Sequence, residues 1–403
     1  MTDGNAYPQD YISVLGRGMQ PADVRQANQR AVLTLVMMDP GISNAGLARR
    51  TGLAPQTISA VLTDLEKSEL VIRGDALRGR RGQPATPMFT NPRGAFCIGV
   101  EIGWTHIRVV LLGITSEVFA EYRRSYDYPD AESIFDELKL AVAEVSAKLS
   151  ASERERLIGV GLAVPSGIGE MSALLSRPRN QASLWAQLDV AKAAAAATGL
   201  DVALVSDGNA ACCSEMVVHP MPKPETAVFL LIDIFVAAAI LGANRLWEST
   251  SGAAVSIGSM RVTDSKGEIR LVNELASLHA LQGRLETTGL GLGALSVDPA
   301  PALLGAILDG WIEEAAPALA QALINTATII DYDLAIIDGV LPEAIRARLV
   351  AETQRHVSCL AGTDRKSPQI AAGHLGRSTI AEGAAQLRLY KRFIFRDLQT
   401  SDS

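Results

Sequence analysis

Apolar positions repeat at helical spacing through the first part of the chain. The spacing predicts a helix that ends before Pro40-Gly41 and a short second helix that Ser43 can cap. Gly52 then allows a tight turn, and Pro55 suits the first turn of a third helix. Two short helices around a glycine turn indicate a helix-turn-helix. The third helix has an i, i+3, i+4, i+7 stripe formed by Ile58, Val61, Leu62 and Leu65.

The opposite face of the third helix is polar. Short or amide side chains of this kind can reach base edges in the major groove of DNA. Arg49 and Arg50 end the preceding helix, where they suit phosphate contacts. The candidate base-reading residues are Gln56, Thr57, Ser59, Ala60 and Thr63.

A basic turn follows a predicted strand at residues 70–72. Residues 78–93 hold four arginines and no acidic residue. Arginines between glycines can enter a narrow minor groove closely, because glycine adds no bulk. We therefore predict a winged helix-turn-helix over residues 1–90, although an exposed basic hairpin on a protein-interaction domain remains an alternative. The candidate contacts in the wing are Arg78, Arg80, Arg81 and Gln83.

Residues 91–403 alternate strand and helix patterns. Two apolar strands surround a tight turn within residues 96–113, and a helix is expected at about 131–150. The second half repeats the theme, with paired strands at 228–241 and a strand at 334–337. This pattern predicts an α/β body of two similar lobes with a cleft between them.

Composition and charge narrow the function classes. Of the 403 residues, 48% are apolar and 20% charged, which excludes global disorder. Residues 1–90 carry a net charge of +2 and the remainder −9, which favours an anionic partner for the amino-terminal part. Asp233 interrupts the longest apolar run, so two buried strands are a better interpretation than a membrane span. We expect a soluble, cytoplasmic protein without membrane contact.

Six segments appear in an order typical of one family. They are GRRGQP in the wing, NPRGAFCIGVEIGWTHIRVVLLG from residue 91, GVGLAVPSG, VSDGNAA, SGAAVSIGSM and AIIDG. From about Asn28 to its carboxyl end the chain resembles the repressor branch of the ROK family (repressors, open reading frames and sugar kinases). The resemblance implies an actin-like, ribonuclease-H-like two-lobed body behind the winged helix. It also implies a homodimer or tetramer that binds a palindromic operator in double-stranded DNA and controls carbohydrate genes.

The body is expected to divide into two lobes. The first lobe is predicted at residues 91–203, joined by a carboxyl-terminal helix at 384–403. The second is predicted at 204–383 and would carry the dimerisation surface.

Two phosphate-binding elements of the family's kinases are altered. In the first hairpin, Glu101 stands for an Asp, Trp104 for the second Gly and His106 for a Lys of the family pattern Asp-x-Gly-Gly-Thr-Lys. In the second lobe, the family's Gly-Thr-Gly-Ile-Gly turn falls on residues 233–239, which hold no glycine. In the kinases these glycines let backbone amides approach the phosphate groups of ATP. Because they are replaced here, we expect no ATP binding, no catalytic residue and no cofactor.

The sugar-binding elements are eroded as well. Asp207 matches the family's general base, and it either binds a hydroxyl of a small carbohydrate effector or caps a helix expected to begin at Asn209. No cysteine occurs in residues 260–275, and the four histidines at 219, 279, 356 and 374 are scattered in the sequence, so we expect no metal site. The candidate effector-binding residues are Asn180, Ser206, Asp207, Ser256, Ser259 and Asn273.

The sequence thus predicts a DNA-binding transcriptional repressor of carbohydrate-related genes with a degenerate kinase-like body for effector sensing and dimerisation. One alternative is an ATP-dependent sugar kinase with an appended DNA-binding domain. Another is a regulator whose body has lost small-molecule control and responds to a protein partner.

Overall fold

The computed structural model divides the chain into two compact units, one formed mainly by the first 94 residues and the other by Ala95–Lys391. Among the helices described, none combines the length and hydropathy needed to cross a bilayer. The structure describes residues 21–75, 86–172, 174–175, 180–219, 223–242, 245–247, 255–297, 301, 303–360, 367–375 and 379–394.

The first unit is a winged helix. A small antiparallel sheet in the order β1-β3-β2 joins three helices, and α4 buries its predicted apolar stripe. The helix-turn-helix prediction is confirmed, but the wing residues Arg78, Arg80, Arg81 and Gln83 lie outside the described residues. The elements are α2 (Pro21–Met38), α3 (Asn44–Thr51), α4 (Pro55–Lys67), β1 (Ile42–Ser43), β2 (Val71–Arg73) and β3 (Pro87–Thr90).

Local sequence signals fix the turn between α3 and α4. The Ser43 hydroxyl accepts a hydrogen bond from the Gly46 amide at 3.2 Å, which caps α3. Gly52 ends that helix with a φ of 69°, a left-handed conformation that glycine adopts without strain. Pro55 is the first residue of α4, where its missing N–H costs nothing.

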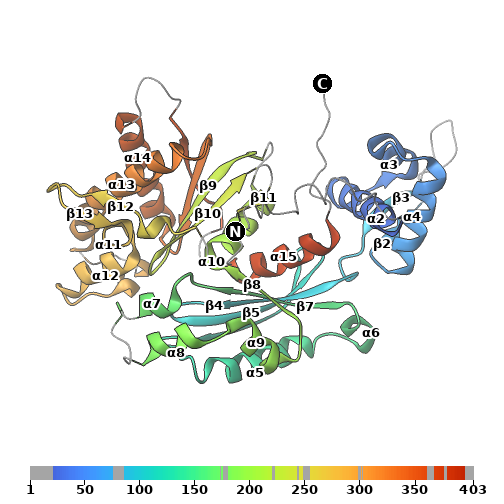
Figure 1. Ribbon diagram of the computed structural model, residues 1–403, viewed down its shortest axis with the longest axis horizontal. Helices are drawn as coiled ribbons and strands as arrows, with labels where there is room; N and C mark the ends of the chain where they lie inside the picture. Colours follow the sequence, from blue (N-terminus) through green and yellow to red (C-terminus); the bar gives the residue numbers. More distant parts are fainter. Residues whose placement is uncertain are drawn as a thin grey trace, which may run out of the picture. The chain divides into compact units, whose positions relative to one another are not determined.

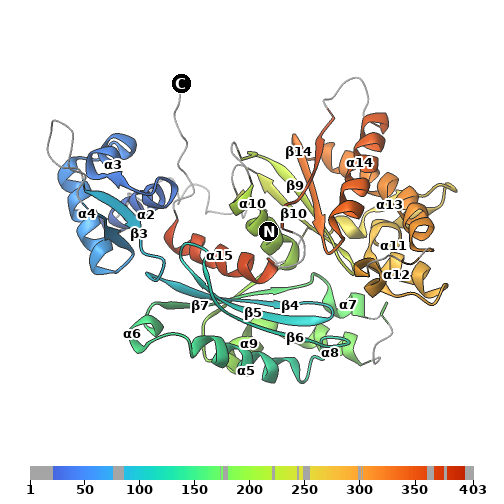
Figure 2. The same ribbon diagram turned by 180° about the vertical axis from the view of Figure 1, so that it is seen from behind.

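The first lobe of the body is a five-stranded sheet in the order β6-β5-β4-β7-β8. Helices α5, α8 and α9 cover one of its faces (Figures 1 and 2). The strands are β4 (Phe96–Ile102), β5 (His106–Gly113), β6 (Val118–Ser125), β7 (Leu157–Val164) and β8 (Val202–Ser206), and the helices are α5 (Ile134–Ser146), α6 (Ala151–Arg154), α7 (Ile168–Ser172), α8 (Gln181–Gln187) and α9 (Val190–Thr198).

Two boundaries in this lobe differ from the sequence predictions. The helix expected at 131–150 is the shorter α5, and a separate short helix, α6, begins after Ser150, which forms a capping box with Glu153. The first lobe also extends past residue 203, since β8 completes its sheet.

The second lobe repeats the first. Its sheet has the order β11-β10-β9-β14-β15, with β9 antiparallel to β10 and parallel to β14, as β4 is to β5 and β7. The predicted two-lobed α/β architecture is therefore confirmed. The elements are β9 (Ala227–Ile232), β10 (Val236–Gly242), β11 (Arg245–Leu246), η1 (Ile257–Ser259), β12 (Arg261–Thr263), β13 (Ile269–Leu271), α11 (Val272–Ala276), α12 (Leu278–Glu286), η2 (Leu292–Ser296), α13 (Leu304–Ala327), β14 (Leu334–Gly339), α14 (Glu343–Leu360) and β15 (Gln369–Ala372).

Two further helices, α10 (Asp207–Val218) and α15 (Ile380–Phe393), lie on the other face of the first sheet (Figure 1). A side chain at Gly99 in β4 or Gly161 in β7 would overlap the α15 backbone, so glycine is required at both positions. In β5, Arg108 pairs with Glu121 and with Glu382 of α15. The terminal helix begins at Ile380 rather than at 384, and residues 395–403 of the predicted helix lie outside the described ones.

Candidate functional site

The outer face of α4 presents the predicted DNA-reading side chains. Gln56, Ser59, Ala60 and Thr63 are exposed, and Thr57 is partly buried, while the opposite face of the helix packs into the first unit. This separation leaves a continuous polar surface along α4 that is free to meet another molecule.

The Ser59 hydroxyl has local partners that the sequence did not reveal. It donates a hydrogen bond to the Pro55 carbonyl and accepts one from the Asn44 side chain, each at 3.0 Å. Ser59 therefore braces α3 against α4, and Gln56 has the longest reach among the exposed candidates.

Arg49 and Arg50 are exposed at the last turn of α3. Arg50 forms an ion pair with Asp39 at 3.2 Å, and both side chains are about half exposed. Within the described residues no acidic group pairs with Arg49. Arg49 is thus the more available cation for a phosphate group.

A second candidate site is a cleft in the body. It encloses about 370 Å³ of space, a figure that includes space open to solvent. Four of the six predicted effector residues line it, namely Asp207, Ser256, Ser259 and Asn273. No Lys or Arg occurs among the described residues that line it.

The other two effector candidates lie elsewhere. Asn180 is exposed at the start of α8 and does not line the cleft. The Ser206 hydroxyl accepts a hydrogen bond from the Asn209 amide at 3.2 Å and caps α10. That helix begins at Asp207 rather than at Asn209, so the capping role considered for Asp207 is wrong: Ser206, in extended backbone conformation one position earlier, performs it.

Asp207 is the most perturbed group in the cleft. Its side chain accepts a hydrogen bond from the Gly208 amide at 2.8 Å, and the residue is only 5% exposed. Burial is the main cause that raises the pKa of Asp207 to about 7; the negative charges of Asp233 and Glu101 contribute to the rise, and backbone hydrogen bonds oppose it. Near neutral pH this carboxyl can therefore donate or accept a hydrogen bond to a hydroxyl group.

Asn273 has a structural role within the cleft wall. Its side-chain oxygen accepts a hydrogen bond from the Val236 amide at 2.7 Å, which ties α11 to β10. A side chain at Gly258 would overlap both Asn273 and the Val236 backbone. The side-chain oxygen of Asn273 is thus occupied, and the hydroxyls of Ser256 and Ser259 are better placed as ligands.

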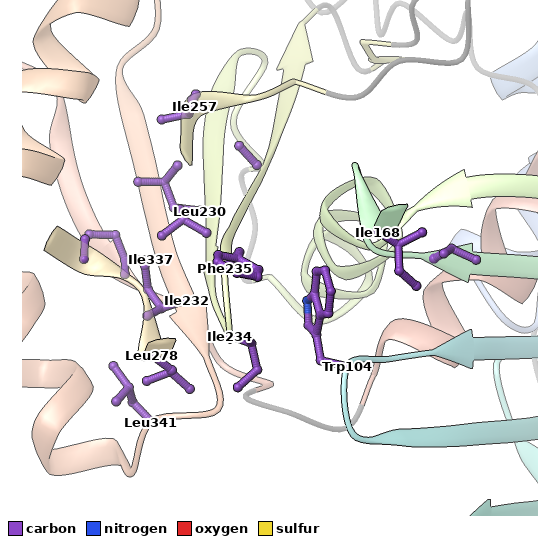
Figure 3. Packing of buried hydrophobic residues seen from close by; sticks show 14 of the residues in the cluster. Trp104, Ile168, Leu230, Ile232, Ile234, Phe235, Ile257, Leu278, Ile337 and Leu341 are labelled. Atoms are coloured by element: carbon purple, nitrogen blue, oxygen red, sulfur yellow. The ribbon is translucent and has the colours of Figure 1, made fainter. Parts of the chain in front are cut away.

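Two aromatic residues that line the cleft contact each other. Trp104 lies in the β4–β5 turn and Phe235 in the β9–β10 turn, which are equivalent turns of the two lobes. Their rings pack edge to face with centroids 5.1 Å apart. Figure 3 shows the two side chains close to each other. Both are nearly fully buried. Sequence reasoning had identified each turn separately as altered, but it gave no signal that the replacing side chains contact each other.

The first hairpin also holds a buried carboxylate. Glu101 lies 3.3 Å from His106 Nε2, and among the described residues its Oε2 finds no hydrogen-bond donor. Together with Asp207 and Asp233 it makes this end of the cleft acidic.

Comparison with known proteins supports this picture. Residues 97–391 match the model of the ROK family. The chain belongs to the ROK family. Residues 25–72 match a winged helix-turn-helix DNA-binding model, within the first unit described above.

The chain is similar both to regulators and to a kinase of the ROK family. The chain is 22% identical to the xylose repressor of Bacillus subtilis over 242 residues, which cover 59% of this chain and 61% of that repressor. A solved ROK family transcriptional regulator, a homologue of Escherichia coli Mlc, is 17% identical with a TM-score of 0.68 and covers 92% of this chain and 98% of its own. A ROK hexokinase from Thermus thermophilus is 16% identical with a TM-score of 0.54 and covers 73% of this chain and 99% of its own. These structures share the fold.

Proposed function

We propose that this ROK protein is a transcriptional repressor of carbohydrate-related genes, which binds a palindromic operator in double-stranded DNA as a homodimer or tetramer. The observation that carries the proposal is the exposed polar face of α4 in a winged helix, beside the exposed Arg49. The relatives named above as a xylose repressor and an Mlc homologue support it.

The ROK body in this proposal is a sensor and not a sugar kinase. Phosphoryl transfer requires positioned donors around the transferred phosphate group. Here the contact between Trp104 and Phe235 fills the space between the two turns where such donors would be needed.

The proposed ligand of the cleft is a small carbohydrate effector. Sugar hydroxyls need partners that both donate and accept hydrogen bonds, and serine hydroxyls and a carboxyl with a pKa near 7 can do both. Asp207, Ser256 and Ser259 supply such groups on the cleft wall. Effector binding would rotate the lobes and alter the spacing of the two DNA-reading heads in a dimer.

DNA binding is tested with the full chain on operator fragments selected from a random pool. Arg49→Ala should weaken binding to every sequence and reduce the magnitude of the log–log salt slope by about 0.9, because one phosphate contact is lost. Gln56→Ala should instead change the preferred sequence, and Arg80→Ala with Arg81→Ala should weaken binding. Arg154→Ala, the same change at an exposed site in the body, is the control. A salt slope of Arg49→Ala equal to those of the wild type and Arg154→Ala would contradict the assignment.

The effector is tested by thermal shift against a panel of monosaccharides. A ligand present at 100 times its dissociation constant should stabilise the protein by about 2.7 kcal/mol. Asp207→Asn should abolish that shift. An effector that weakens operator binding must itself be bound more weakly, by the same factor, when operator is present. A sugar that shifts the variant as much as the wild type would place the site elsewhere.

A further inference from the structure

Two of the histidines that are scattered in the sequence converge in the structure on one buried glutamate. Glu215 and His219 lie on consecutive turns at the end of α10, and His374 lies in the segment between β15 and α15. One ligand atom from each of the three residues lies within 4.8 Å of the other two. We propose that Glu215, His219 and His374 bind one divalent transition-metal ion, and that Zn²⁺ is the ion that best matches these ligands.

The geometry directs three donor atoms to one point. Glu215 Oε1 lies 2.6 Å from His374 Nδ1 and 3.6 Å from His219 Nδ1. The two imidazole rings stand edge to face with centroids 5.7 Å apart. Zinc binds nitrogen and oxygen donors at about 2.0–2.2 Å, so tetrahedral ligands lie about 3.4 Å from each other. Side-chain shifts of about 1 Å bring these donors to that separation.

The residue types match a known class of zinc site. Two histidines and one glutamate leave a fourth position open for water or another ligand. Imidazole suits zinc, copper, iron and nickel, whereas magnesium and calcium prefer oxygen donors alone. The side chain of His374 is about half exposed, so an ion can enter from solvent without unfolding of the lobe.

Burial makes an ion at this point favourable. The Glu215 side chain has no exposure to solvent, and a buried charge is costly unless it is paired. His219 Nδ1 is buried and makes no hydrogen bond to any residue that the structure describes. A metal ion would supply a partner for His219 Nδ1 and would replace the hydrogen bond between Glu215 Oε1 and His374 Nδ1, which are 2.6 Å apart.

A backbone contact holds the carboxylate in the right orientation. Glu215 Oε2 accepts a hydrogen bond from the His374 amide at 3.0 Å, so Oε1 is left to face the two imidazoles. Outer hydrogen bonds of this kind orient metal ligands and strengthen binding. The site differs in residues and position from the family's cysteine-containing segment, which falls on Ser259 and 260–275 in this chain.

An ion here would couple two parts of the body. It would fix the end of α10 to the segment that leads into α15, while the first residue of α10 is Asp207 in the cleft. Because metal would bind the folded state alone, the melting temperature should rise with the concentration of free ion.

The test uses the untagged full chain, stripped with a chelator and titrated with Zn²⁺. Elemental analysis should find about one zinc per chain after removal of excess ion, and the melting temperature should rise on titration. Co²⁺ should give visible d–d absorption without the strong near-ultraviolet band of thiolate ligands. A zinc content near zero, or no shift up to millimolar Zn²⁺, would overturn the proposal.

Variants locate the ion. His374→Ala, at the half-exposed ligand, should weaken zinc binding at least about 100-fold while it leaves the circular dichroism of the metal-free protein unchanged. Glu215→Gln should weaken zinc binding in the same way. If Glu215→Gln does not fold because residue 215 is buried, the zinc affinity of His374→Ala alone tests the site. His356→Ala, the same change outside the cluster, should keep wild-type affinity. Zinc retained by His374→Ala, or lost equally from His356→Ala, would show that the ion lies elsewhere.

Discussion

Replacement of Asp207 by asparagine should stabilise the protein above neutral pH and do so far less in acid. In the wild type the Asp207 side chain accepts a hydrogen bond from the Gly208 amide at 2.8 Å. Asparagine keeps an oxygen that can accept this bond and removes only the charge. Burial holds the pKa of Asp207 at about 7, against an ordinary value of 3.8. The carboxyl therefore stays protonated in the folded chain at pH values where it is ionised in the unfolded chain.

The sign and size of the effect follow from this difference. The favourable contribution of Asp207 is fully present below a pH of about 4 and is lost as the pH rises through about 7, because the unfolded state releases its proton first. At about 1.4 kcal/mol per unit of pKa, the loss approaches about 4 kcal/mol in alkaline solution. Between pH 5 and pH 8.5 the advantage of Asp207→Asn over the wild type should grow by roughly 2–3 kcal/mol.

Melting temperatures at the two pH values check this prediction. In a body of this size about 1 kcal/mol moves the midpoint by about 2 °C, so the difference between variant and wild type should grow by about 5 °C. Asp127→Asn, the same change at an exposed site, is the control. An Asp207→Asn offset that is constant with pH, or larger at pH 5, would refute the reasoning.

Three further predictions concern the body. Trp104→Ala and Phe235→Ala should each cost about 3–5 kcal/mol of unfolding free energy in urea, with a coupling of about 0.5–1.5 kcal/mol in a double-mutant cycle; zero coupling would deny that the ring contact matters. Trp104→Gly should show no phosphorylation of a hexose panel with ATP, because Phe235 still closes the other turn; wild-type turnover that Asp207→Asn abolishes would contradict this. Arg108→Met should cost about 3–5 kcal/mol in urea because it leaves Glu382 buried without its partner, and adding Glu382→Gln should recover part of that loss; no recovery would speak against the pair.

The sequence predicts the elements of this fold well because their signals are local. The apolar stripe of α4, the Gly52 turn and the paired strands of each lobe all appear within short windows of sequence, and the structure contains them. The role of Asp207 as a helix cap failed on a local detail, since the neighbouring Ser206 has the backbone conformation that a cap requires.

Contacts between distant segments could not be read in the same way. Trp104 and Phe235 belong to equivalent turns of different lobes, and only the packing of the lobes shows that they touch. Glu215 and His374 are 159 positions apart, so the cluster around them has no sequence spacing that would reveal it. The raised pKa of Asp207 likewise depends on burial by segments from both lobes.

The position of α15 has a consequence for synthesis of the chain. Glu382 of α15 pairs with Arg108, which is 274 positions earlier in the sequence. The same helix packs against the glycines of β4 and β7. At about 5–20 residues per second, the ribosome needs roughly 15–60 s after the first strand of the body to deliver this helix. The winged helix has its main contacts within the first 94 residues and can fold early, while the part of the first sheet that α15 covers is still exposed. The newly made body therefore keeps apolar surface of this sheet open to other molecules until α15 has been synthesised.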